Sequence, residues 1–290
     1  MACEYFSQMD QNALQNLPIG LFDSGVGGLT VLKALRQRMP SEDLLYLGDT
    51  ARLPYGTKSA ETIVRYALQA SAVLIERKIK LLVVACNTAT SVALEALQKA
   101  YDVPVIGVVE PGAQASCRAS KAGHIAVIAT DSTIRGEAYH KAIHRLRPDA
   151  CIVGQPCPLF VSLAEEGWIE GDIAERVAAR YLDPIFNPEF GGDAVQTPDC
   201  LVLGCTHFPL LAKAIRSVVG PDVVIVDSAA TTAQTVQAEL ERLNLVHAAG
   251  QCGYGATQFL TTDDVPRFAR TGGLFLGTPI APDDVELVNL

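Results

Sequence analysis

The sequence lacks the motifs that would organise its cysteines into a metal site or a disulfide framework. None of the eight cysteines belongs to a Cys-x-x-Cys pair, and Cys151 and Cys157 are too widely spaced for a zinc knuckle. His140 and His144 lie four residues apart on a predicted helix face, but the sequence offers no third ligand beside them. We therefore predict no metal site and, in a chain of 290 residues without a secretory leader, reduced thiols.

Positive charge and long apolar runs are also scarce. The 23 Lys and Arg residues are outnumbered by 32 Asp and Glu residues, and the net charge of −9 argues against nucleic acid as a partner, because binding it needs a basic face. No apolar run is long enough to span a membrane. Residues 1–17 lack the basic and apolar regions of a signal peptide, so we expect a disordered extension there and a cytoplasmic protein without a membrane partner.

What the sequence does contain is a regular alternation of short apolar segments with amphipathic ones. Such apolar segments are typical of strands buried on both faces, and their alternation with helical periodicity predicts an α/β fold of parallel sheets covered by helices. A stretch rich in glycine and proline at 187–198 is the best candidate for a loop or insertion. The predicted strands are 19–22, 44–47, 81–85, 105–109, 125–129, 151–154, 200–203, 223–226 and 258–261, and the predicted helices are 29–38, 59–78, 90–101, 134–146, 158–166, 172–182, 209–219, 230–243 and 265–270.

Two of these strands end in a cysteine that is followed by small hydrogen-bonding residues. Cys86 comes directly before Asn87 and Thr88, and Cys205 comes before a Thr-His pair. Each thiol lies at the carboxyl end of a strand, where open α/β sheets bind ligands. Each also precedes a helix N-terminus, whose dipole favours a thiolate. We predict that the two thiols face one substrate.

A glycine-rich turn and a long loop follow the first two strands. The turn at 23–28 either binds an anion through backbone N–H groups or is a tight turn in which Asp23 or Ser24 caps the next helix. It does not match the Gly-x-Gly-x-x-Gly fingerprint, which disfavours a dinucleotide site. The loop at 48–57 is long for a connection between a strand and a helix, and such ordered loops tend to be functional.

Three reactions fit reactive thiols in this arrangement. Acyl transfer needs one cysteine with a histidine base and leaves the second thiol unused. Dithiol redox chemistry needs two sulfurs within bonding distance, which separate strand ends suit poorly. Proton transfer on opposite faces of one carbon uses both thiols, and Asp23, Glu165 or His207 could assist them. This last reaction, that of a cofactor-independent racemase or epimerase, accounts best for the pair.

Five groups of motifs are similar to those of one enzyme family. They are the segments 22–29, 48–50 with 54–56, 85–89, 107–111 and 203–211. Together and in this order, they make residues 19–275 resemble the glutamate racemases, within the wider aspartate/glutamate racemase superfamily. The extension at 1–17 and the stretch at 187–198 lie outside the shared pattern.

The resemblance implies an activity for the chain. Members of the family interconvert L- and D-glutamate for peptidoglycan synthesis without pyridoxal phosphate, metal or nucleotide, so we expect no cofactor. By matching motif, Cys86 acts on the α-proton of D-glutamate and Cys205 acts on that of L-glutamate.

The resemblance also implies auxiliary and substrate-binding residues. Asp23 matches an acid/base group beside the first thiol, and His207, helped by Glu165, matches the one beside the second; the adjacent Glu166 leaves the match to Glu165 open. Mostly neutral donors would bind the substrate, which suits a site that holds an anion beside a thiolate. The matching substrate-binding residues are Asp23, Ser24, Pro54, Tyr55, Gly56, Asn87, Thr88, Thr130, Thr133, Thr206 and His207.

The family fold implies two pseudo-symmetric α/β domains with the active site at their interface. The first domain is expected over 18–109 and 229–290, with the second, 110–228, inserted into it. Many relatives are homodimers, so we expect one here, with a small amino acid as substrate. The rival interpretations are a racemase for another amino acid such as aspartate, a thiol hydrolase, and a binding protein without catalysis. The two aligned thiols disfavour the last two.

Overall fold

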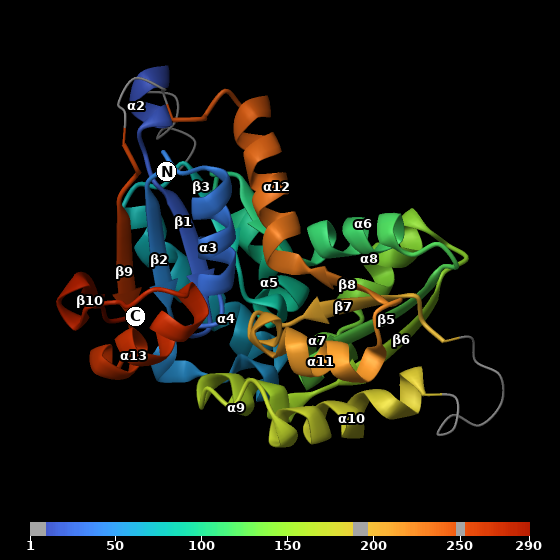
Figure 1. Ribbon diagram of the computed structural model, residues 1–290. Helices are drawn as coiled ribbons and strands as arrows, with labels where there is room; N and C mark the ends of the chain where they lie inside the picture. Colours follow the sequence, from blue (N-terminus) through green and yellow to red (C-terminus); the bar gives the residue numbers. More distant parts are fainter. Residues whose placement is uncertain (1–9, 188–196, 248–252) are drawn as a thin grey trace. The chain divides into compact units, whose positions relative to one another are not determined.

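The structure, a computed structural model, describes residues 10–187, 197–247 and 253–290 (Figure 1). These residues form two compact units, one from the chain up to Val108 together with Ala229–Leu290, and the other from Val109–Ser228. Each unit contains a sheet whose strands are all parallel, which confirms the predicted α/β fold class. Residues 1–9 of the predicted extension and most of the predicted loop at 187–198 lie outside the described ranges.

The first unit is built on a six-stranded sheet. Its strands, in sheet order, are β10 (Val285–Leu287), β9 (Thr257–Thr261), β2 (Leu44–Gly48), β1 (Ile19–Asp23), β3 (Leu81–Val84) and β4 (Val105–Gly107). The chain runs from β1 to β2 on one side and then crosses to β3 on the other side of β1. The loops that leave β1 and β3 therefore diverge at a topological switch point, where open α/β sheets bind their ligands.

The helices of the first unit are held by caps and by apolar contact with the sheet. Helices α4 (Ala60–Glu76) and α5 (Asn87–Ala100) pack together over a core that includes β2 and β3, and Ser59 caps α4 by accepting a hydrogen bond from Thr62 N–H. Helix α3 (Leu29–Arg38) packs against α13 (Val265–Leu276). The remaining elements are α2 (Gln11–Gln15), η1 (Thr50–Arg52), η2 (Tyr55–Thr57), α12 (Ser228–Arg242) and η4 (Pro282–Asp284).

The second unit has a four-stranded sheet with the same kind of reversal. Its strands, in sheet order, are β6 (Cys151–Pro156), β5 (His124–Ala129), β7 (Cys200–Gly204) and β8 (Val224–Asp227). The chain runs from β5 to β6 and then crosses to β7 on the other side of β5, so a second switch point lies between β5 and β7. Cys205 follows β7 directly, and Cys86 follows β3 after one residue. Each of the two thiols therefore lies at the switch point of its own unit.

Successive side chains along the strands of the second sheet point to opposite faces, and each face has its own apolar core. Ala126 and Ile128 of β5 belong to one core cluster, and Ile125 and Val127 belong to another, as the two-residue period of a strand requires. The first cluster includes side chains of α9, α10 and α11, and the second includes side chains of α6 and α8. These helices are α6 (Val109–Ala119), α8 (Ala138–Leu146), α9 (Pro158–Glu165), α10 (Asp172–Phe186) and α11 (Ala212–Val219), with α7 (Asp131–Arg135) and η3 (Phe208–Leu211) between them in the chain.

Several predicted elements differ from the structure. The strand predicted over 105–109 ends at Gly107, and α6, which was not predicted, follows at once; Pro111 is tolerated there because the first turn of a helix needs no N–H donor. The predicted helix at 209–219 begins as the 3₁₀ turn η3. Helix α13 extends to Leu276 rather than 270, and β10 was not predicted.

The extension predicted as disordered is partly helical. Residues Gln11–Gln15 form α2, because the Asp10 side chain accepts a hydrogen bond from Ala13 N–H and Leu14 is buried. Gln11 and Gln15 also donate side-chain hydrogen bonds to the carbonyl of Asn244, which ties this turn to the segment after α12. Across the described ranges, none of the helices combines the length and the apolar character that crossing a membrane requires.

Candidate active site

Cys86 occupies the N-cap position of α5. Its sulfur accepts a hydrogen bond from Ala89 N–H at 3.4 Å, and its thiol donates to Ser24 Oγ, also at 3.4 Å. Helix α5 therefore begins at Asn87 rather than at residue 90, where the sequence pattern predicted it. The N-terminus of a 14-residue helix lies directly at the sulfur, and its dipole and N–H groups stabilise a thiolate.

The glycine-rich turn brings Asp23 and Ser24 to the same switch point. Asp23 ends β1, is fully buried, and accepts a hydrogen bond from Gly25 N–H on Oδ2 at 2.9 Å. Neither Asp23 nor Ser24 caps the following helix, since the N-cap of α3 is Gly28, without a side-chain hydrogen bond. The turn thus presents the side chain of Ser24 to Cys86 instead of closing a helix.

The loop at 49–57 carries Pro54, Tyr55 and Gly56 on the 3₁₀ turn η2 and its N-cap. The Tyr55 ring is buried between Phe22 and Tyr66, with ring centroids 6.2 Å and 5.8 Å away. Burial and the neighbouring Asp49 carboxylate raise the pKa of Tyr55 far above its ordinary value, with a smaller contribution from Cys86. The phenol therefore stays protonated and does not serve as an acid or base.

Two further predicted residues, Asn87 and Thr88, form the first turn of α5 directly after Cys86. Both are buried. The first unit therefore groups Asp23, Ser24, Asn87 and Thr88 at the carboxyl ends of β1 and β3, at its switch point.

In the second unit, Cys205, His207 and Glu165 form a row. Cys205 Sγ lies 3.9 Å from His207 Nδ1, and His207 Nε2 lies 3.2 Å from Glu165 Oε1. Burial disfavours the charged imidazole, but hydrogen bonds to Cys205 and Glu165 outweigh it and raise the pKa of His207 from 6.5 to about 10. The imidazolium is therefore present at neutral pH and is lost as the pH rises through about 10, so it can stabilise a Cys205 thiolate or donate a proton.

The structure distinguishes Glu165 from Glu166, which the sequence could not. Glu165, the last residue of α9, reaches His207, whereas Glu166 is exposed.

We expect Glu165→Gln to lower the pKa of His207 toward its ordinary value and to reduce turnover about tenfold, because the imidazolium loses its charged partner. Histidine NMR titration and steady-state kinetics measure both effects. Glu166→Gln is the matched control, and equal losses in the two variants would contradict this assignment.

The remaining predicted residues lie at the second switch point. Thr130 caps α7, accepting a hydrogen bond from Thr133 N–H at 3.4 Å, and the two hydroxyl oxygens lie 3.0 Å apart. They follow β5, and Thr206 follows β7 after the buried Cys205. Thr130, Thr133, Thr206 and Cys205 thus share the carboxyl edge of neighbouring parallel strands.

The other described cysteines differ from this pair. Cys157 and Cys200 are buried, and burial raises the pKa of each thiol, to about 12 for Cys200. Cys151 is exposed on β6. Within residues 10–187, 197–247 and 253–290, no group of three or more His, Cys, Asp or Glu side chains could hold a metal ion.

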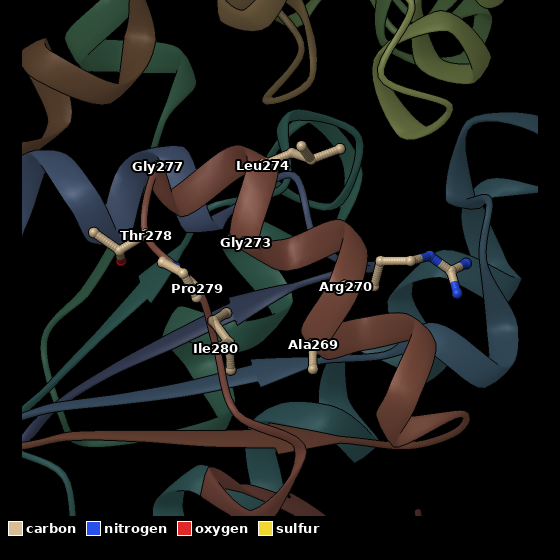
Figure 2. A pocket seen from close by; sticks show the side chains of 8 residues that line it. All are labelled: Ala269, Arg270, Gly273, Leu274, Gly277, Thr278, Pro279 and Ile280. Carbon is tan, nitrogen blue, oxygen red and sulfur yellow. The ribbon is translucent and has the colours of Figure 1, made fainter.

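A hollow of about 510 Å³ in the first unit contains none of the predicted site residues. It lies between α13 and the segment that follows that helix, and Figure 2 labels the residues that line it (Ala269, Arg270, Gly273, Leu274, Gly277, Thr278, Pro279 and Ile280). The lining is mostly apolar and carries one charged side chain, so it offers no acid or base pair.

Sequence comparison places these motifs among known proteins. The Asp/Glu/Hydantoin racemase family matches residues 29–236, which include both thiols. A protein named glutamate racemase from Geobacter metallireducens is 47% identical to this chain over 94% of the chain and 96% of its own length.

Solved structures resemble this fold over nearly the whole chain. A glutamate racemase from Francisella tularensis in complex with D-glutamate superimposes with a TM-score of 0.85 at 35% identity, covering 95% of this chain and 98% of that one. A glutamate racemase from Thermus thermophilus in complex with β-chloro-D-alanine gives a TM-score of 0.82 at 41% identity, with the same coverage.

Proposed function

Because the chain belongs to the Asp/Glu/Hydantoin racemase family, as its motifs predicted, we propose that it interconverts L- and D-glutamate by proton transfer without a cofactor. The observation that carries this proposal is the thiol at each switch point, Cys86 against Ser24 in one unit and Cys205 against His207 in the other. The names of the relatives, and the D-glutamate bound to one of them, support glutamate as the substrate.

In the proposed reaction, the two thiols act on opposite faces of the substrate's Cα. The Cys86 thiolate removes the α-proton of D-glutamate, and the electron pair of the broken C–H bond remains on the carbon and its carboxylate. The Cys205 thiol then donates its proton to the other face, which yields L-glutamate and a Cys205 thiolate. The reverse reaction begins at Cys205, so each sulfur must reach both protonation states.

The thiolate form of each sulfur is stabilised by different neighbouring groups. At Cys86 the N-terminus of α5 stabilises the thiolate, and we propose that Asp23 assists its proton transfer. At Cys205 the protonated His207, held by Glu165, provides the stabilising charge. The proposed substrate contacts of Ser24, Asn87 and Thr88 in one unit, and of Thr130, Thr133 and Thr206 in the other, are neutral hydrogen-bonding groups that can bind carboxylates as charge develops.

An assay in heavy water tests this function. The protein is incubated with either enantiomer of glutamate, and circular dichroism follows racemisation while NMR follows deuterium at Cα. We expect both enantiomers to react, with deuterium in the product and no dependence on added pyridoxal phosphate, metal or chelator. Parallel reactions with aspartate should be far slower. Absence of reaction with both glutamate enantiomers, in protein shown to be folded, would contradict the proposal.

The same resemblance supports two further parts of the proposal. The product D-glutamate would supply peptidoglycan synthesis, in keeping with the bacterial sources of the relatives. The enzyme would be a homodimer, which sedimentation equilibrium at several protein concentrations would test; a mass equal to one chain at all of them would contradict it.

A further inference from the structure

We propose that Asp49 is a positioning residue, which holds the loop bearing Pro54, Tyr55 and Gly56 in the conformation that binds substrate. This inference rests on the proposed function. The sequence placed Asp49 in a family motif but assigned it no role. Its side chain is fully buried at the end of β2, and its N–H donates to the carbonyl of Asp23 at 3.0 Å.

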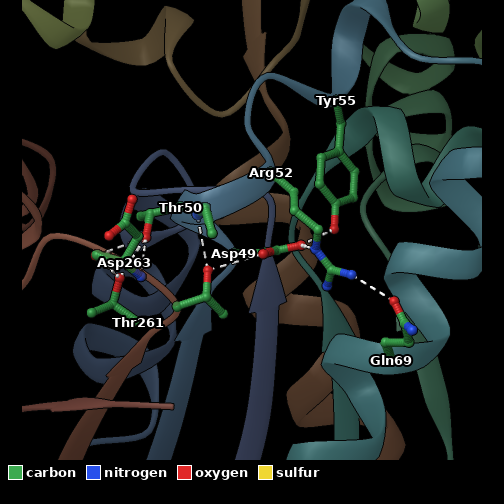
Figure 3. A network of polar contacts seen from close by, with 9 residues as sticks. Asp49, Thr50, Arg52, Tyr55, Gln69, Thr261 and Asp263 are labelled. Atoms are coloured by element: carbon green, nitrogen blue, oxygen red, sulfur yellow. Dashed lines mark hydrogen bonds and ion pairs between the residues drawn. The ribbon is translucent and has the colours of Figure 1, made fainter. Parts of the chain in front are cut away.

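The Asp49 carboxylate accepts hydrogen bonds from three side chains. Two of them belong to the two 3₁₀ turns of the loop, and the third lies more than two hundred residues further along the chain. Oδ2 accepts hydrogen bonds from Tyr55 Oη at 2.5 Å and from Arg52 Nε at 2.7 Å. Oδ1 accepts one from Thr262 Oγ1 at 3.0 Å. Figure 3 shows this arrangement, in which the carboxylate connects the two 3₁₀ turns of the loop to the segment after β9. Buried hydrogen bonds to a charged acceptor are the strong kind, so the loop has one preferred position.

Arg52 balances the buried charge and extends the network to α4. Its Nη1 donates to Gln69 Oε1 at 2.6 Å, and its guanidinium lies 4.2 Å from the centre of the Tyr66 ring. Tyr66 in turn packs against the Tyr55 ring. One negative and one positive charge are therefore paired within the loop, so Asp49 adds no net charge beside Cys86.

The start of the loop is attached separately to the neighbouring strand. Thr50 Oγ1 lies 2.7 Å from Thr261 Oγ1 and donates to the carbonyl of Asp263 at 2.9 Å (Figure 3). Ala51 N–H donates to Thr262 Oγ1 at 2.9 Å. The two Thr50 contacts anchor η1 without Asp49, whereas Tyr55 of η2 is bonded to the Asp49 carboxylate directly. Loss of the carboxylate should therefore release the Tyr55–Gly56 end of the loop first.

Asp49→Asn tests this role. The amide has the same shape, but its NH₂ group must face at least one of the three donors, whichever way it is turned. Because the loop would contact substrate in the ground state and the transition state alike, we expect KM to rise about tenfold for both enantiomers while kcat changes less than about threefold. Glu286→Gln is the matched control: it removes a carboxylate that pairs with Arg77 on the surface of the same unit, and its KM should equal that of the wild type.

A coupling measurement separates this role from general stability. Tyr55→Phe removes one donor and keeps the ring, so it should raise KM in the wild type, but less in the Asp49→Asn background. An unchanged KM in the Asp49→Asn variant would overturn the proposal. If kcat falls while KM is unchanged, the variant only has a smaller folded fraction, and the proposal is overturned as well. An inactive wild-type protein would overturn the proposed function and this inference together, whereas an active wild type with these results would contradict the role of Asp49 alone.

Discussion

Replacing either Cys86 or Cys205 with serine is expected to slow glutamate racemisation by about a thousandfold or more. A serine hydroxyl has the size of a thiol but ionises at far higher pH, so the variant lacks a base on one face of the substrate and an efficient acid in the reverse direction. Because the two enantiomers have equal free energy in solution, kcat/KM must fall equally in both directions. Polarimetry or circular dichroism with each enantiomer measures both rates.

Cys151→Ser is the matched control for this experiment. Cys151 is exposed on β6 and touches neither switch point, so the same chemical change there should leave the rates unaltered. The Cys86 variant carries the most information. The Cys205–His207–Glu165 row alone offers a base on only one face of the substrate, so full racemase activity of Cys86→Ser would contradict the two-thiol mechanism.

The second large loss of racemase activity is expected when Gly28, which has no charge and no side chain, is replaced. Its backbone is in the ordinary right-handed helical region, so what requires glycine there is space. A Cβ at this position would lie 2.6 Å from the Cβ of Asp23 and 3.0 Å from that of Ala85. Gly28→Ala should therefore displace Asp23, and if Asp23 assists Cys86, racemisation should fall about a hundredfold.

Gly253→Ala controls for the substitution itself. Among the described atoms of the chain, nothing lies within 4 Å of a Cβ added at Gly253, so this variant should retain full activity. Far-ultraviolet circular dichroism and thermal unfolding would show whether Gly28→Ala remains folded at the assay temperature. A folded Gly28→Ala protein with wild-type kinetics would contradict the proposed role of Asp23 or its displacement.

Local sequence patterns predicted the two strands that end at the thiols, because a buried strand leaves a local signal in the sequence. A short apolar run bounded by polar residues favours a buried strand, and the structure has one over Leu81–Val84. The errors occurred where local signals compete. A strand was predicted to run to residue 109, yet Val109 already begins α6, and Pro111 lies in the first turn of that helix, where proline is tolerated. A polar N-terminus suggested disorder, yet Asp10 and Leu14 stabilise a short helix there.

By itself, the sequence determined the α/β class, the two thiols at strand ends and the family, since composition, periodicity and motif order all lie along the chain. Only the tertiary structure decided which groups surround those thiols. Strand order places Ser24 against Cys86, and the packing of α9 brings Glu165 rather than Glu166 to His207. The same holds for Asp49 and Thr262, which are more than two hundred residues apart and meet because β2 and β9 are neighbours in the sheet. Long-range strand pairing, which no local pattern encodes, sets these contacts.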